Sequence, residues 1–185
     1  MEKLSNRMHQ LSTGWAALTA LLLFLLFSAL ILPAQAERAE TYSGDVGSPD
    51  SSFFYTADKL YQFAESYGPQ GRQAYIRARW TFDLIWPLVY TAFLGTAISW
   101  LIKQTSQKES RLRFINLIPV LSMLLDFIEN SGASIVMARY PQQTPVLAHL
   151  TGFFTALKWL SIGGSFVALA FVLLLAIWKL IKSLQ

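Results

Sequence analysis

Three polar side chains interrupt an apolar stretch in the second half of the chain. Asp126, Glu129 and Asn130 are spaced at i, i+3 and i+4, so they share one face if this stretch is a helix. A carboxylate inside a membrane span costs at least ~2.5 kcal/mol on insertion scales, and such groups therefore usually have a partner or a function. Two carboxylates and an amide could perform acid–base chemistry, bind a polar ligand or pair with cations. This face is the starting point of a candidate site.

Charged groups at the ends of neighbouring apolar stretches are expected at the same level. Steps of seven, four and seven residues place Arg72, Arg79, Asp83 and Tyr90 on one helical face. Lys158 lies directly before the last apolar stretch. The candidate ligand-binding residues are therefore Arg72, Arg79, Asp83, Tyr90, Asp126, Glu129, Asn130 and Lys158. Of these, the carboxylates of Asp83, Asp126 and Glu129 are the candidate catalytic groups.

The composition favours a membrane protein. The 185 residues are 54% hydrophobic and 14% charged, whereas soluble domains are typically about 25% charged. The absence of cysteine excludes disulfides and thiolate chemistry, and two histidines far apart in the sequence argue against a histidine metal site. No metal site is predicted, and no motif indicates a particular cofactor. The basic residues flank apolar stretches and form no patch, so nucleic acid is not an expected partner.

Four stretches approach the ~20 apolar residues that cross a bilayer. They cover about 15–32, 84–102, 114–133 and 159–178. The predicted fold is an all-α integral membrane protein with one domain over 1–185, built as an antiparallel bundle of four transmembrane helices. The first outer loop is predicted to hold a linker over 37–52, rich in Ser, Gly, Asp and Pro, and then a short amphipathic helix over about 53–67.

The basic residues predict the orientation. Positively charged residues favour the cytoplasmic side, which places both termini in the cytoplasm of a plasma or inner membrane. Asp126 and Glu129 then lie ~18 and ~22 Å beyond residue 114, in the outer third of the bilayer. The basic residues concerned are Lys3 and Arg7 before the first span, Lys103, Lys108, Arg111 and Arg113 after the second, and Lys179 and Lys182 after the fourth.

The first apolar stretch allows a second interpretation. Ala34, Gln35 and Ala36 form a small-residue sequence typical of signal-peptide cleavage sites, and cleavage after Ala36 would leave three spans. The apolar stretch of 15–32 is longer than the ~7–15 residues usual for a signal peptide, which favours a retained span.

Three classes of function remain open. A binding or accessory protein with a charged pocket near the outer leaflet comes first, because the chain is small and has no explicit catalytic motif. A membrane enzyme that acts on a lipid-like substrate by carboxylate acid–base chemistry is second, and a transporter or ion path is third. The charges could also serve only as structural pairs.

The expected partners are the bilayer, a lipid or small amphiphile, and subunits of a membrane complex. An accessory subunit should leave the aromatic residues Phe53, Phe54 and Tyr61 uncovered in the isolated chain. An enzyme should instead leave at least one carboxylate without Lys158 or an arginine beside it.

Overall fold

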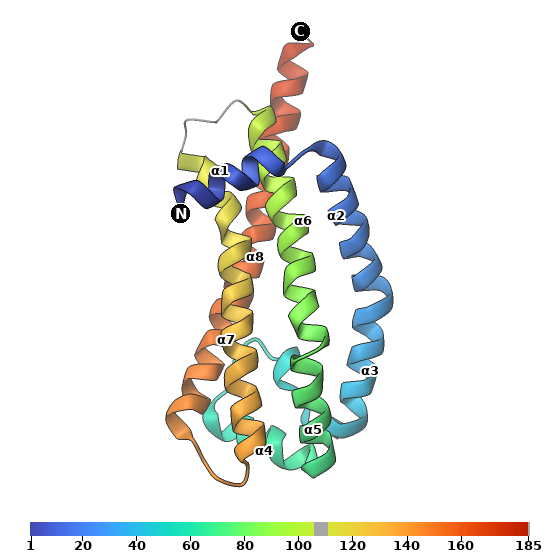
Figure 1. Cartoon of the computed structure of the whole chain (residues 1–185), viewed down its shortest axis with the longest axis vertical. Coiled ribbons are helices and arrows are strands. Elements are labelled where there is room, and N and C mark those ends of the chain that lie inside the picture. Colours follow the sequence, from blue (N-terminus) through green and yellow to red (C-terminus); the bar gives the residue numbers. More distant parts are fainter. Residues whose placement is uncertain (106–110, 185) are drawn as a thin grey trace. The chain divides into compact units, whose positions relative to one another are not determined.

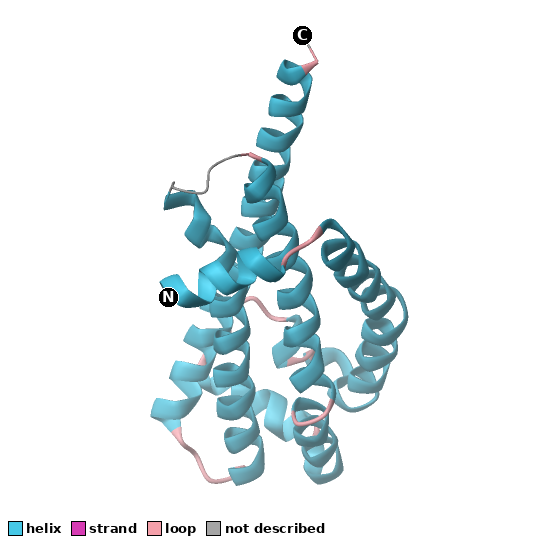
Figure 2. Cartoon of the chain, turned by 45° about the horizontal axis from the view of Figure 1, so that its top comes forward, coloured by secondary structure: helices cyan, strands magenta, loops and turns pink. Residues whose placement is uncertain are grey.

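All regular structure in the described residues is helical. The computed structural model describes residues 1–105 and 111–184, within which there is no strand (Figure 1). Lys108, one of the basic residues used to predict the orientation, lies outside these residues. Figure 2 shows that short loops join most of the helices. The α-helices are α1 (Glu2–Leu11), α2 (Gly14–Leu26), α3 (Leu32–Ser43), α4 (Ala57–Ser66), α5 (Gly68–Arg79), α6 (Phe82–Gln104), α7 (Ile118–Arg139) and α8 (Pro145–Ser183).

The chain divides into two compact units. Unit 1 comprises Met1–Leu25, Leu88–Ser122 and Leu160–Gln185, and unit 2 comprises Leu26–Pro87 and Met123–Trp159. Unit 1 has a core in which Ile98, Leu101 and Ile102 of α6 pack with Ala168 and Val172 of α8.

Three helical stretches are long and apolar enough to cross a membrane. They are Gly14–Ser43, Gly68–Gln104 and Pro145–Ser183, and they indicate a membrane protein. The prediction of an all-helical fold is confirmed, because the described residues form helices and no strand. The remaining predicted span coincides largely with α7 (Ile118–Arg139), which is helical but does not belong to these three, so the count of four spans stays a prediction.

The linker expected over 37–52 is shorter in the structure. A π-helical turn, η1 (Phe27–Ile31), connects α2 to α3, and the helix continues to Ser43. Pro33 closely follows the π-helical turn and the helix continues past it, since a local π adjustment can accommodate a proline within a helix. Ala36, the residue before the alternative cleavage site, consequently lies inside a helix. Two short 3-10 turns, η2 (Gly44–Val46) and η3 (Pro49–Ser51), complete the segment.

The amphipathic helix predicted over about 53–67 corresponds to α4 (Ala57–Ser66). Its first residue is fixed by Thr56, whose side chain accepts a hydrogen bond from the Lys59 amide at 3.3 Å. Leu60, Phe63 and Ala64 are at most 1% exposed. They pack in the core of unit 2 with residues of α7 and α8, namely Ala133, Val136, Met137 and Ala148.

Two glycines allow close packing in unit 2. A side chain at Gly132 of α7 would collide with Thr151 of α8, and a side chain at Gly152 would collide with the backbone carbonyl of Tyr55. The backbone of α8 therefore lies directly against the segment that precedes α4.

Gly152→Ala should lower the thermal unfolding temperature, because the new methyl group would force α8 away from the Tyr55 backbone. Gly163→Ala in the same helix is the matched control, since nothing lies within 4 Å of its added carbon. The control should unfold at the wild-type temperature or above it, because alanine favours helix over glycine by about 1 kcal/mol. Unfolding of the purified protein in lipid nanodiscs measures both, and an equal response of the two variants would contradict the close approach.

Candidate functional site

Six of the eight predicted site residues meet in unit 2. Hydrogen bonds and ion pairs connect them into one network that also includes residues absent from the prediction. The six are Arg79, Asp83, Asp126, Glu129, Asn130 and Lys158, and each of them is at most 9% exposed.

Lys158 is shared between two acids of α7. Its Nζ atom lies 2.5 Å from Oε2 of Glu129 and 4.0 Å from Oδ1 of Asp126. Glu129 is completely buried and Lys158 is 6% exposed. The shorter contact is a charge-assisted hydrogen bond, whereas the longer one is an ion pair beyond hydrogen-bonding distance. Lys158 therefore has one tightly held and one loosely held carboxylate.

Arg79 is shared between two acids in the same way. Its guanidinium donates two hydrogen bonds to the carboxylate of Asp50, at 2.5 and 2.6 Å. Its Nη2 also lies 2.8 Å from Oδ2 of Asp83, but the angles of this ion pair are not those of a hydrogen bond. Asp50 is thus the tightly held carboxylate and Asp83 the loosely held one.

Asn130 links the two clusters. Its amide oxygen accepts a hydrogen bond of 3.4 Å from Nη1 of Arg79, and its amide nitrogen donates one of 3.1 Å to Oδ1 of Asp126. The spacing of Asp126, Glu129 and Asn130 on α7 brings all three into the network. One continuous polar chain therefore runs from η3 through α5 and α7 to α8.

Tyr55 extends the network beyond the predicted residues. Its hydroxyl donates to Oε1 of Glu129 at 3.3 Å and accepts a hydrogen bond of 3.0 Å from Thr155. Burial raises the pKa of Tyr55 well above its ordinary value, and the negative charge of Glu129 raises the pKa further. The hydroxyl therefore remains protonated and is a permanent donor to Glu129.

Tyr55 and Asp50 carry no sequence signal that marks them as site residues. Asp50 belongs to a segment that the sequence describes as a linker, and Tyr55 lies in the extended stretch before α4. The structure shows a local cap that the sequence analysis did not use: the side chain of Ser48 accepts a hydrogen bond from the Asp50 amide and fixes the turn η3.

Two predicted site residues lie elsewhere. Arg72 donates to the carbonyl of Ala64 at 2.9 Å and stacks over the ring of Tyr140 at 5.0 Å. Its contacts are therefore those of a residue that joins α4, α5 and the end of α7. Tyr90 is buried in unit 1.

The charges of the network do not balance. Four carboxylates, those of Asp50, Asp83, Asp126 and Glu129, share two cations. A fully ionised network would carry two surplus negative charges in a region with little water, which is unfavourable. The arrangement can hold protons or attract a cationic group, and its two loosely held acids are the groups with capacity for acid–base chemistry. Among the described residues, no three side chains of the His, Asp or Glu type lie as a group that could bind a metal ion.

No protein-family model, no curated protein and no solved structure matches the chain.

Glu129→Gln and Asp126→Asn should differ in their effect on stability. Loss of the Glu129 charge breaks the 2.5 Å contact of a buried lysine, so we expect a loss of about 3 kcal/mol. Asp126→Asn leaves that contact intact and removes one surplus charge, so we expect a loss below about 1 kcal/mol. Chemical unfolding of the two variants in the same detergent measures the difference, and equal losses would show that the two acids are not held differently.

Tyr55→Phe should lower the free energy of unfolding by about 1–2 kcal/mol, because Glu129 loses a donor and Thr155 loses an acceptor in a buried place. Tyr42→Phe is the matched control on a residue that is 41% exposed, and we expect a change within about 0.5 kcal/mol. The same unfolding measurement serves both variants. A Tyr55→Phe protein as stable as the control would remove Tyr55 from the network.

Proposed function

We propose that this chain is a binding or accessory subunit of a membrane assembly, and that its partner docks on the beginning of α8. The proposal rests mainly on one observation, an exposed apolar ridge at the start of that helix. The network of unit 2 then has a structural task, which is to hold the helix that carries the ridge.

The length of α8 exceeds the thickness of a bilayer. Its 39 residues extend roughly 58 Å at 1.5 Å per residue, against about 30 Å of hydrocarbon. Trp159 and Trp178 are 37% and 61% exposed, and their separation along the helix is roughly 28 Å. Tryptophan is enriched at membrane interfaces. We therefore place the hydrocarbon between these two residues, with Lys179 and Lys182 on the cytoplasmic side and the acids of the network near the outer interface.

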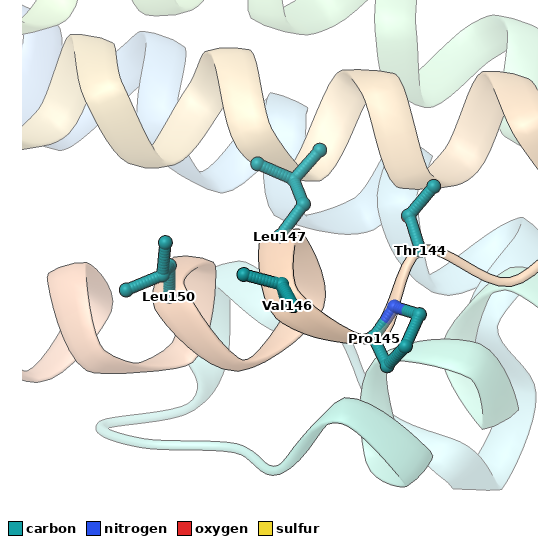
Figure 3. A pocket seen from close by; sticks show the side chains of 5 residues that line it. All are labelled: Thr144, Pro145, Val146, Leu147 and Leu150. Atoms are coloured by element: carbon teal, nitrogen blue, oxygen red, sulfur yellow. The ribbon is translucent and has the colours of Figure 1, made fainter.

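This placement leaves nearly four turns at the start of α8 outside the hydrocarbon. Val146, Leu150 and Phe153 follow each other at i, i+4 and i+7 and are 74%, 47% and 53% exposed. Beside them lies an open apolar hollow of about 410 Å³, which Figure 3 shows around the beginning of the helix. Its lining consists of Thr144, Pro145, Val146, Leu147 and Leu150. A contiguous apolar surface in water is typical of a protein-binding site.

The aromatic residues before α4 add support. Phe53 and Phe54 are 57% and 56% exposed, as expected of an accessory subunit, whereas Tyr61 is buried. The hydroxyl of Tyr61 accepts a hydrogen bond of 2.7 Å from the amide of Thr144. Tyr61 therefore helps to fix the start of α8 and is unavailable to a partner.

A membrane enzyme with a lipid-like substrate is the second candidate. This candidate is favoured by the weaker contacts that Asp83 and Asp126 make with Arg79 and Lys158, because carboxylates held in this way could exchange protons with a substrate. Two observations argue for the first candidate instead. Each of the four carboxylates lies beside Arg79 or Lys158, and the hollow at the start of α8 includes no residue of the network.

Native mass spectrometry after gentle extraction tests the proposal. The wild-type chain should be recovered with a second polypeptide, and the double variant Val146→Ser, Leu150→Ser should lose most of that polypeptide while it keeps its unfolding temperature. Ile135→Ser, on an exposed residue of α7 in the same unit, should retain the partner. A wild-type chain recovered alone with a small-molecule adduct would refute the docking proposal and favour the enzyme or a ligand-binding protein.

A further inference from the structure

Helix α1 is attached to the rest of unit 1 by buried hydrogen bonds. The hydroxyl of Ser5 donates to the amide oxygen of Asn116 at 2.9 Å, and the amide nitrogen of Asn116 donates to Ser99 at 2.9 Å. All three side chains are completely buried. Figure 1 shows α1 lying across the ends of α6 and η4 (Arg111–Leu117).

His9 makes the most unusual contacts of this helix. Its Nδ1 atom lies 3.2 Å from the carbonyl oxygen of Ser99, and its Nε2 atom lies 3.0 Å from the carbonyl oxygen of Arg113. A carbonyl oxygen can only accept a hydrogen bond. A neutral imidazole has one N–H group, so one of its two nitrogens would face a carbonyl with a lone pair. Only the doubly protonated ring donates to both oxygens.

We propose that His9 is a pH-dependent latch, which fastens α1 to the ends of α6 and η4 when its ring carries both protons. Docking of the helix then requires a bound proton. By linkage, docking is favoured at low pH and weakens as the pH rises through the range in which imidazoles titrate. The segment affected is α1, because Ser99 and Arg113 belong to the elements that it covers.

Several other charged groups lie around this interface. The carboxylate of Glu2 and the amide oxygen of Asn6 both accept from the guanidinium of Arg113, at 3.2 and 2.7 Å. Lys103 donates to the carbonyl of Ser12. The charged groups on the described parts of α1, the end of α6 and η4 are the amino group of Met1 and the side chains of Glu2, Lys3, Arg7, Lys103, Arg111 and Arg113. On these elements, His9 is the residue whose ring faces a carbonyl oxygen with each of its two nitrogens.

The composition of the chain suits a direct test. The sequence has no cysteine, so pairs of spin labels can be introduced at chosen positions. Gln10 of α1 and Leu121 of α7 are exposed residues of unit 1. Pulsed electron paramagnetic resonance on the Gln10→Cys, Leu121→Cys protein in nanodiscs reports the distance between the two labels.

At about pH 5.5 we expect one narrow distance distribution, which represents docked α1. At about pH 8.5 a second, broad distribution, which represents undocked α1, should be about fivefold more populated than at pH 5.5. A factor of about five corresponds to the loss of one hydrogen bond. His9→Gln has no ring to titrate and should show the broad population at both pH values. His149→Gln, which changes the exposed second histidine, should behave as the wild type. A pH-independent distance in the wild type, or an unchanged pH response in His9→Gln, would overturn the proposal.

A second measurement keeps the test decisive if His9→Gln does not fold. With ¹⁵N-labelled histidine in the otherwise unlabelled wild-type chain, nuclear magnetic resonance distinguishes neutral from doubly protonated rings, and His149 is the internal reference. At the pH at which α1 is docked, both ring nitrogens of His9 should carry protons. A neutral His9 ring in the docked protein would equally refute the latch.

Discussion

The contact between Lys158 and Glu129 is the interaction on which unit 2 depends. Both groups are buried, and neither charge has water as a substitute partner if the other is lost. The contact joins α7 to α8, and through Tyr55 it also holds the segment that enters α4. Because a buried ion pair is sensitive to geometry, all elements around it must pack closely, and glycines at positions 132 and 152 make that packing feasible.

The two clusters of the network have the same plan. Each cation holds one carboxylate tightly and a second one loosely. Asn130 connects the two clusters, because its amide oxygen accepts a hydrogen bond from Arg79 and its amide nitrogen donates one to Asp126. This network of ion pairs and hydrogen bonds helps to specify which helices are neighbours, because buried polar groups that lost these partners would be left unpaired. The network is buried, whereas the ridge on α8 is exposed and available to a partner under the proposed function.

The sequence predicted much of the network and little of its surroundings. Helical spacing was sufficient to predict that Asp126, Glu129 and Asn130 lie together, since a single helix carries them. It was also sufficient to predict that Arg79 and Asp83 lie together, since they are four residues apart. Asp50 and Tyr55 could not be predicted in this way, because their partners lie 29 and 74 positions away in the sequence. Helical spacing relates only residues that are close in the sequence. Arg72 is in the same helix as Arg79, but seven residues separate them, which is roughly 10 Å along the axis. Its guanidinium contacts the Ala64 carbonyl and the ring of Tyr140 instead of the network.

The contacts of α1 also set an order of events during synthesis. Ser5 bonds with a residue 111 positions later in the chain, and His9 with one 104 positions later. At about 5–20 residues per second, a ribosome needs roughly 5–20 s to reach those residues. Throughout that interval α1 lacks these partners, because it is synthesised before the elements that it contacts. Docking of α1 must therefore wait until the chain has been made as far as η4.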